Sequence, residues 1–275
     1  MSVTLNAYAK INLGLNVTGR SGGLHTIDTV MCTVSLCDEI TVERSADGMN
    51  QVFSDTQVDG ENSAARAARL YTSAFGGGYR IKIKKKIPFG AGLGGSSADA
   101  AGVFRALAAL NGREPAADML SAAGSDVPFM YSGGAARVRG TGGECLALTF
   151  PKRRVLIAVP PFSVSTAAAY AAYDAVGGDE ADILRIAEAL QSGDIYAFNG
   201  CLKNALFRGA AETEPRLKNF ADLVEKACRP FGAPFVMTGS GSGFAVLAND
   251  GDLLKISKIL KSASRVFITE IQGGC

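Results

Sequence analysis

The alternation of apolar and polar residues predicts several strands in this 275-residue chain. Residues 11–17 alternate strictly, and residues 79–87 alternate isoleucine with lysine, which is typical of strands with one buried and one solvated face. Residues 27–42 are rich in β-branched residues and predict a longer strand that bends near Cys37 and Asp38. Shorter apolar runs predict further strands at residues 155–159, 235–237, 244–247 and 266–271.

Helical patterns lie between these strands in an irregular order. The predicted helices span residues 62–75, 98–110, 116–123, 165–173, 183–191, 196–207, 215–228 and 253–262. Residues 47–60 are polar and predict a loop. Because the strands are grouped and do not alternate regularly with helices, we expect an α+β fold. The basic run at residues 151–154 predicts a boundary between two domains, at residues 1–150 and 151–275.

The composition is that of a soluble globular protein, with 47% hydrophobic and 20% charged residues. The net charge of +2 is too small to attract nucleic acid or a membrane surface, and no apolar run reaches the ~18 residues that a membrane span needs. The six cysteines are scattered without a Cys-x-x-Cys pair, and His25 is the single histidine, so we expect reduced thiols and no protein-ligated metal. These features predict a cytoplasmic protein without nucleic-acid or membrane partners.

The most informative segment is a glycine-rich stretch at residues 88–101, Pro-Phe-Gly-Ala-Gly-Leu-Gly-Gly-Ser-Ser-Ala-Asp-Ala-Ala, which runs into a predicted helix. Glycine lets the backbone approach a ligand closely, and the first turn of a helix directs unpaired N–H groups and the positive end of its dipole toward the loop. Such a loop binds anions, phosphate above all. Basic residues precede it at Arg80, Lys82, Lys84, Lys85 and Lys86. The segment therefore predicts a nucleotide-phosphate site.

Three common phosphate-binding loops do not fit these residues. Gly90, Gly92 and Gly95 match the spacing of a dinucleotide-binding fingerprint, but no strand with an acidic tip follows at the required distance. A Walker A loop needs a lysine after the glycines, and the glycine loop of a protein kinase lies between strands. A tight strand-to-helix turn without a ligand stays open as the alternative.

Three segments resemble the three motifs of the GHMP small-molecule kinases, in the order and at the spacing of that family. They are Ala-Lys-Ile-Asn-Leu at residues 9–13, the loop at residues 88–98 with its Gly-Leu-Gly-Gly-Ser-Ser core, and Thr-Gly-Ser-Gly-Ser-Gly at residues 238–243. The resemblance implies an N-terminal ribosomal-S5-like domain and a C-terminal ferredoxin-like domain. It also implies ATP as co-substrate, with Mg²⁺ held mainly by phosphate oxygens and water.

Further segments are similar to one branch of the family. These are residues 10–17, 23–26, 30–36, 124–129 and 132–135. They imply ATP-dependent phosphorylation of the 2-hydroxyl of 4-diphosphocytidyl-2-C-methyl-D-erythritol, a small cytidyl diphosphate, in the non-mevalonate route to isoprenoid precursors. Another GHMP kinase, of the homoserine or mevalonate type, and a nucleotide-binding protein without turnover remain the alternatives. We expect a monomer or weak homodimer.

The chain departs from the family pattern at two positions. Leu24 occupies the place of a tyrosine that forms an aromatic platform for cytosine, and Ser96 replaces the third glycine of the usual Gly-Leu-Gly-Gly-Gly-Ser. An aliphatic Leu24 still excludes water from the base but lacks the stacking contribution of a ring. A flexible loop tolerates Ser96.

The resemblance also implies roles for individual residues. Lys10 would hold and polarise the attacking hydroxyl and Asp126 would accept its proton, since phosphoryl transfer depends chiefly on positioning and charge neutralisation. The implied ATP-binding residues are Asn62, Ser63, Lys85, Pro88, Phe89, Gly90, Ala91, Gly92, Leu93, Gly94, Gly95, Ser96, Ser97 and Ala98. The implied substrate-binding residues are Asn12, Leu24, His25, Tyr170, Thr238 and Gly239. In this scheme His25 bonds the edge of the cytosine and Tyr170 stacks on one face.

Overall fold

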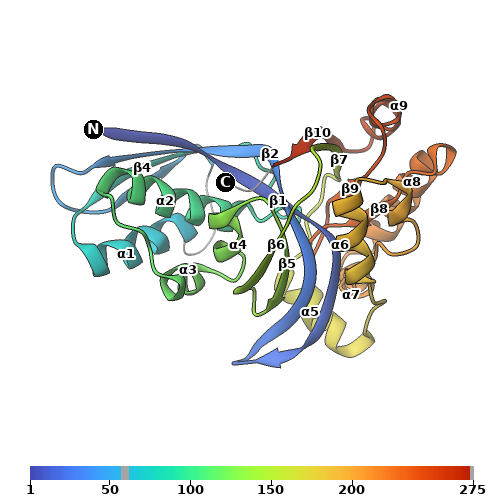
Figure 1. Cartoon of the computed structure of the whole chain (residues 1–275), viewed down its shortest axis with the longest axis horizontal. Coiled ribbons are helices and arrows are strands. Elements are labelled where there is room, and N and C mark those ends of the chain that lie inside the picture. The colour runs from blue at the N-terminus through green and yellow to red at the C-terminus, as the bar shows by residue number, and fades with distance from the viewer. Residues whose placement is uncertain (57–61, 273–275) are drawn as a thin grey trace.

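The structure, a computed structural model, describes residues 1–56 and 62–272. Its longest elements are two N-terminal strands, β1 (Ser2–Ser21) and β2 (Leu24–Arg44), which form an antiparallel hairpin that runs across much of the molecule (Figure 1). The strands predicted in this part of the chain are confirmed. So is the bend near Cys37, because a register shift interrupts the pairing just before that residue. The hairpin joins the two halves of the protein.

In the N-terminal half, short strands and four helices pack on this hairpin. Strand β4 (Tyr79–Lys84) pairs antiparallel with β2, and β3 (Gln51–Ser54) pairs in parallel with β4. Figure 1 shows the helices gathered on one side of these strands. They are α1 (Ser63–Phe75), α2 (Gly95–Asn111), α3 (Ala117–Ala123) and α4 (Val127–Ser132). The loop predicted at residues 47–60 is wrong in part, since the four residues of β3 gain their strand conformation from pairing with β4, and residues 57–60 lie outside the described part of the chain.

Helix α2 is the central helix of this half. Its small residues let it approach the hairpin closely, since a Cβ atom at Gly102 would lie 3.0 Å from the Cβ of Ala7. Phe104 and Leu107 on the same helix are completely buried, so α2 contributes large side chains to the core beside its small ones. The helix begins earlier than the alanine pattern predicts, at Gly95, because the end of the glycine loop forms its first turn.

A second hairpin extends the sheet beside β2. Its strands are β5 (Ala135–Gly140), which pairs with β2, and β6 (Glu144–Leu148), which pairs with β5. The sequence pattern missed both strands, because β6 is largely solvent-exposed and lacks a clear apolar face. The turn of this hairpin nevertheless packs closely against the segment before α4, since a Cβ at Gly142 would lie 2.2 Å from the backbone oxygen of Ser125.

The C-terminal half continues the same sheet. Its strands are β7 (Arg153–Val159), β8 (Phe235–Met237), β9 (Phe244–Val246) and β10 (Arg265–Ile271). The main path of the sheet has the order β3-β4-β2-β10-β7-β9-β8. The helices are α5 (Thr166–Val176), α6 (Ile183–Ser192), α7 (Phe207–Thr213), α8 (Arg216–Cys228) and α9 (Asp250–Leu260), with single 3₁₀ turns at Tyr196–Phe198 and Arg229–Phe231.

Buried side chains form two hydrophobic cores that share these elements. One core lies between the hairpin and the N-terminal helices, and the other lies under α5, α7, α8 and α9. Strand β7 serves both, because Val155 and Ile157 point into the first core while Leu156 and Ala158 point into the second. The mixed α/β arrangement confirms the expected fold class, while the boundary after residue 150 stays a prediction.

One long predicted helix is wrong. The helix expected at residues 196–207 is limited to the 3₁₀ turn Tyr196–Phe198, and α7 starts only at its last residue. Two features interrupt it. Gly200 has a φ of +80°, outside the helical region, and the Asn204 side chain binds distant carbonyl groups.

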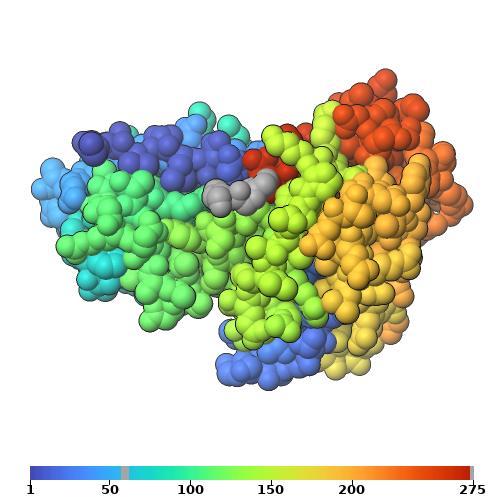
Figure 2. All heavy atoms as spheres, viewed as in Figure 1, coloured from blue at the N-terminus to red at the C-terminus, as the bar shows by residue number. Residues whose placement is uncertain are grey.

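The surface is hollowed between the two halves. In the space-filling view a notch opens at the lower edge, between the green helices of the N-terminal half and the blue tip of the β1–β2 hairpin (Figure 2). Helix α5 lies beside that tip (Figure 1). Among the described residues no helix combines the length and the apolar character that crossing a membrane requires.

Candidate active site

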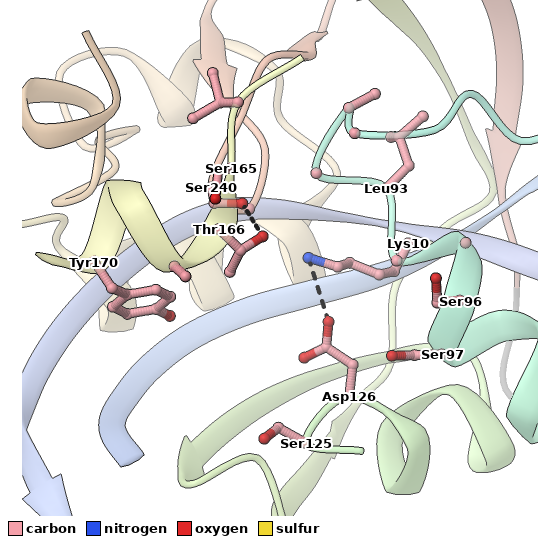
Figure 3. A pocket seen from close by; sticks show the side chains of 18 of the residues that line it. Lys10, Leu93, Ser96, Ser97, Ser125, Asp126, Ser165, Thr166, Tyr170 and Ser240 are labelled. Atoms are coloured by element: carbon pink, nitrogen blue, oxygen red, sulfur yellow. Dashed lines mark hydrogen bonds and ion pairs between the residues drawn. The ribbon is translucent and has the colours of Figure 1, made fainter. Parts of the chain in front are cut away.

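A cleft with a volume of about 990 Å³ is lined by residues from both halves. Its walls are the loop between β4 and α2, the starts of α1 and α4, the tip of the β1–β2 hairpin, and α5. In Figure 3 the ammonium of Lys10 and the carboxylate of Asp126 point toward each other across the cleft, with Ser96 and Ser97 on one side and Tyr170 on the other. Every predicted site residue lines this cleft except Ala98 and Thr238, which are buried behind its wall.

The glycine loop owes its shape to backbone conformations that favour glycine. Gly90, Gly92 and Gly94 have φ values of +64°, +71° and +69°. Space is also limiting, since a Cβ at Gly92 would lie 2.0 Å from the carbonyl oxygen of Thr238. The loop leads directly into α2 at Gly95, whose first N–H groups have no partner within the helix. The conformation therefore presents backbone donors to the cleft, as an anion site requires.

Hydrogen bonds join the three sequence motifs into one unit. The backbone N–H of Lys10 donates to the carbonyl of Leu93 at 3.0 Å, and the hydroxyl of Thr238 donates to that of Gly92 at 3.2 Å. The N–H of Gly243 donates to the carbonyl of Ala91 at 3.2 Å. Segments as far as about 150 residues apart thus support one another, and Thr238 contributes from behind the wall of the cleft.

Lys10 and Asp126 form the charged centre of the cleft. Their Nζ and Oδ2 atoms are 3.6 Å apart, and the Lys10 side chain is only 6% exposed while that of Asp126 is 24% exposed. The aliphatic stem of Lys10 passes Gly94 closely, since a Cβ there would lie 3.0 Å from its Cγ. Lys10 is therefore held in place, while Asp126 remains accessible to a bound molecule.

The side chain of Asn12 holds the ammonium of Lys10 in place. Its Oδ1 accepts from Lys10 Nζ at 2.7 Å and from the backbone N–H of Gly239 at 3.0 Å. Its Nδ2 donates to the hydroxyl of Thr29 at 2.8 Å, and the residue is fully buried. Because both ends of the amide are used inside the protein, the geometry gives Asn12 a role in aligning Lys10.

Sequence reasoning missed Asn204, which shapes the third motif. Its amide donates one hydrogen bond to the carbonyl of Met237 and another to that of Gly239, each 2.8 Å long. Its Oδ1 accepts from the N–H of Leu206 at 2.9 Å. A lone asparagine in a segment with a helical pattern carries no local signal of this function. Only its fully used hydrogen-bonding capacity reveals it.

Lys85 lines the cleft, and its ammonium lies between two buried carboxylates. Nζ is 2.5 Å from Oδ2 of Asp38 and 2.7 Å from Oδ2 of Asp99. Burial opposes the charged ammonium, but the carboxylates of Asp99 and Asp38 outweigh it and raise the pKa of Lys85 above its ordinary value. The other oxygen of Asp38 accepts from the backbone N–H groups of Lys86 and Ile87. This cluster ties the end of β4 to the first turn of α2.

The other predicted ATP-binding residues surround this part of the cleft. Asn62 caps α1, where its side chain accepts from the N–H of Ala64 at 2.9 Å, and Ser63 is the first residue of that helix. Phe89 lies at the edge of the glycine loop and is 75% exposed. Ala98 on α2 is buried and does not line the cleft, so it can support the loop only through packing.

The opposite end of the cleft is built from side chains on the hairpin tip and on α5. The rings of His25 and Tyr170 are stacked, with centroids 4.6 Å apart and planes inclined by 28°. Leu24 beside them is 55% exposed. Two residues that sequence reasoning did not consider complete this end, because Asp174 binds both His25 and Arg20. Burial, with a smaller contribution from Asp126, raises the pKa of Tyr170 to about 12, so its hydroxyl stays protonated at neutral pH.

Comparison with known proteins identifies the class. The family model of the GHMP kinases N-terminal domain matches residues 62–134, which include the glycine loop and Asp126. A crystal structure of a homoserine kinase from Cytophaga hutchinsonii shares the fold with a TM-score of 0.69 over 97% of this chain, at 19% identity. Residues 62–134 thus match a GHMP kinase N-terminal domain, and the whole chain shares the fold of that homoserine kinase.

Closer relatives narrow the class to one family. A protein of Moorella thermoacetica named 4-diphosphocytidyl-2-C-methyl-D-erythritol kinase is 36% identical over 91% of both chains. A protein of the same name from Thermus thermophilus is 36% identical and covers 98% of this chain and 96% of its own. A crystal structure titled 4-(cytidine 5'-diphospho)-2C-methyl-D-erythritol kinase superimposes with a TM-score of 0.81, 34% identity and 99% coverage. The chain belongs to the family of the 4-diphosphocytidyl-2-C-methyl-D-erythritol kinases.

Proposed function

We propose that this chain transfers the γ-phosphoryl group of ATP to the 2-hydroxyl of 4-diphosphocytidyl-2-C-methyl-D-erythritol. The observation that carries this proposal is the layout of one continuous cleft. It has a glycine loop at one end, Lys10 and Asp126 in the middle, and the stacked rings of His25 and Tyr170 at the other end. The family supplies the name of the substrate, and the cleft has a place for each of its parts.

The centre of the cleft suits phosphoryl transfer. A substrate hydroxyl between Lys10 and Asp126 would meet a cation that stabilises its developing negative charge and a carboxylate that can accept its proton. The loop and the start of α2 would hold the phosphates of ATP on the opposite side of that hydroxyl. Asn12 keeps the Lys10 ammonium in place before the ligands arrive, so little reorganisation is needed in the transition state.

Magnesium fits this site as a companion of ATP. Within the described residues no group of three or more His, Cys, Asp or Glu side chains could hold a metal by itself. The oxygen donors near the loop include the hydroxyls of Ser96 and Ser97, while Oδ2 of Asp99 is paired with Lys85. Mg²⁺ would therefore be bound chiefly by phosphate oxygens and water. When bound, it neutralises charge on the transferred group.

The far end of the cleft suits a cytosine. A base that is hydrogen-bonded to the edge of His25 lies in the plane of that ring, and this plane is nearly parallel to the ring of Tyr170. One base can therefore bond His25 and stack beside it on Tyr170 at the same time. Leu24 would cover the remaining face with aliphatic carbon.

An ADP-release assay with a panel of alcohols tests the proposal. We expect turnover with 4-diphosphocytidyl-2-C-methyl-D-erythritol and little with homoserine, mevalonate or 2-C-methylerythritol 4-phosphate, which lacks the base. Phosphorus NMR of the product should place the new phosphate on the 2-hydroxyl. The variant Lys10→Met, purified in parallel, controls for contaminating kinases. Equal turnover of the base-free compound would contradict the assigned substrate, and no turnover with any alcohol would leave a nucleotide-binding protein.

A further inference from the structure

A cluster of polar side chains joins the hairpin tip to α5 at the rim of the cleft. Arg20 on β1 and His25 on β2 are directly opposite each other in the strand ladder, so their side chains share one face of the hairpin. Both reach the same carboxylate. Nε2 of His25 is 2.8 Å from Oδ1 of Asp174, and the guanidinium of Arg20 donates to Oδ2. Asp174 thus binds one group from each strand.

The carboxylate in this cluster determines which ring nitrogen of His25 carries a hydrogen. The hydrogen bond from His25, followed by that from Arg20, lowers the pKa of Asp174, so its carboxylate is ionised at neutral pH and can only accept hydrogen bonds. Nε2 must then carry a hydrogen. Arg20 supplies a second, permanently charged partner to the same carboxylate. A neutral imidazole with hydrogen on Nε2 has a lone pair on Nδ1.

Helix α5 places this carboxylate next to the stacking ring. Tyr170 precedes Asp174 by four residues, so both lie on the same face of the helix, and both line the cleft. One face of α5 therefore stacks against the His25 ring and also holds its Nε2 atom. The histidine is fixed in both orientation and tautomer. Among the hydrogen bonds of the described residues, none uses its Nδ1.

We propose that Asp174 is a positioning residue that makes His25 an acceptor for the exocyclic amino group of cytosine. The inference rests on the proposed function and deepens it. Cytosine carries an amino group, a donor, where uracil carries a carbonyl oxygen, an acceptor. A lone pair on Nδ1 binds the first and repels the second. Asp174 therefore makes the cleft select cytidyl over uridyl diphosphate substrates, although it does not contact the base.

The variant Asp174→Asn is designed to reverse the tautomer. Arg20 offers only donors, so it takes the amide oxygen of the asparagine. The amide nitrogen then faces Nε2 of His25 with a hydrogen, and Nε2 has to become the acceptor. The ring proton moves to Nδ1, which now donates. This arrangement suits the carbonyl oxygen of uracil and no longer suits the amino group of cytosine.

Two measurements follow on tag-free protein. His25 is the only histidine of the chain, so nitrogen NMR of ¹⁵N-histidine-labelled protein reports on one ring. We expect the Nε2–H tautomer in the wild type and the Nδ1–H tautomer in Asp174→Asn. In kinetics we expect Asp174→Asn to lower kcat/KM for the cytidyl substrate by about ten-fold or more, the scale of a lost and mismatched hydrogen bond, with the KM for ATP unchanged. Its preference for the cytidyl over the uridyl analogue should narrow by at least the same factor.

Controls separate this role from a purely structural one. Asp179 lies just beyond α5 and forms an exposed pair with Arg208, so Asp179→Asn removes a similar surface charge outside the cleft and should change neither measurement. Asp174→Ala, which imposes no tautomer, should weaken binding of both analogues.

Specific outcomes would overturn the inference. They are an Nδ1–H tautomer or an imidazolium in the wild type at pH 7.5, unchanged cytidyl preference in Asp174→Asn, or an equal rise in the KM for ATP. If the wild type does not phosphorylate the cytidyl substrate, the proposed function fails together with base selection. The NMR result still shows in that case whether Asp174 controls the tautomer of His25.

Discussion

The two ends of the cleft are built by different means. At the glycine-loop end, which we propose binds phosphates and call the phosphate end, backbone groups dominate: glycines in left-handed conformations, a helix start, and hydrogen bonds between main-chain atoms of the three motifs. At the end formed by the hairpin tip and one face of α5, which we propose binds the base and call the base end, side chains dominate. Both ends carry exposed side chains, Phe89 at the phosphate end and Leu24 and Arg20 at the base end, so the difference lies in what builds each end and not in burial.

This difference in construction matches the chemical group that each end is proposed to recognise. Every ATP presents the same phosphates, so a main-chain site that tolerates few substitutions is sufficient there. The acceptor alcohol differs between branches of the GHMP kinases, and side chains on a rim can change without disturbing the sheet. Substitutions can test this division, beginning with the centre between the two ends.

The largest effect is expected at Lys10 and Asp126. Lys10→Met and Asp126→Asn each remove one charge with little change in shape, and each should lower kcat by ~100-fold or more, with smaller changes in KM. Because the two groups act on the same hydroxyl, the kcat of the double variant should be little lower than that of the less active single variant. Steady-state kinetics on all three proteins checks this. Independent, multiplying losses would show that the residues do not act as a unit.

The phosphate end should be sensitive to a single methyl group. Gly94→Ala places a Cβ 3.0 Å from Cγ of Lys10 at a φ of +69°, so it strains the backbone and also displaces the lysine. Gly112→Ala at the other end of α2 has a φ of +66° and no neighbour within 4 Å, so it carries the backbone strain alone. We expect both to lower stability similarly, and only Gly94→Ala to weaken ATP binding by ~10-fold in calorimetry. Equal ATP affinity of the two variants would place the phosphates elsewhere.

The support behind the phosphate end can be tested at Asn204. Asn204→Ala leaves the carbonyls of Met237 and Gly239 without their donors, and should lower the free energy of unfolding by ~1–3 kcal/mol. Since Gly239 contacts Asn12, a several-fold loss of kcat should accompany it. Asn199→Ala, at an exposed position in the same segment, is the matched control for urea denaturation and kinetics. Stability like that of the control would mean that the third motif holds its shape without Asn204.

The smallest effect is expected at the base end. Leu24→Tyr restores the ring that the family pattern has there and adds a stacking contact of ~0.5–1.5 kcal/mol. The KM for the cytidyl substrate should fall several-fold at most, and the KM for ATP should not change. Leu184→Tyr, at another exposed leucine on α6, controls for added surface area. A large loss of activity in Leu24→Tyr would indicate that the leucine side of the pocket is already filled.

The amino-acid sequence alone determined the elements and the chemistry that depend on local patterns. Alternation of apolar residues predicted the centre of β1, β-branched content predicted β2, and the glycine run predicted a loop that leads into a helix. These predictions succeeded because each depends on neighbours within a few residues, where conformational preference and spacing are decisive. The motif resemblance then gave the class and the family, and Lys10 and Asp126 as the candidate catalytic pair.

Only the tertiary structure decided which distant groups meet. Strand β3 and the hairpin of β5 and β6 form because partner strands are available. The helix predicted at residues 196–207 does not form, because the Asn204 side chain binds the distant glycine turn of the third motif. At the base end, Asp174 and His25 are 149 residues apart in the chain. Their contact is set by how α5 packs against the hairpin tip, and no local pattern encodes that packing. For this reason the sequence could nominate His25 but could not reveal the carboxylate that determines which of its nitrogens carries the proton.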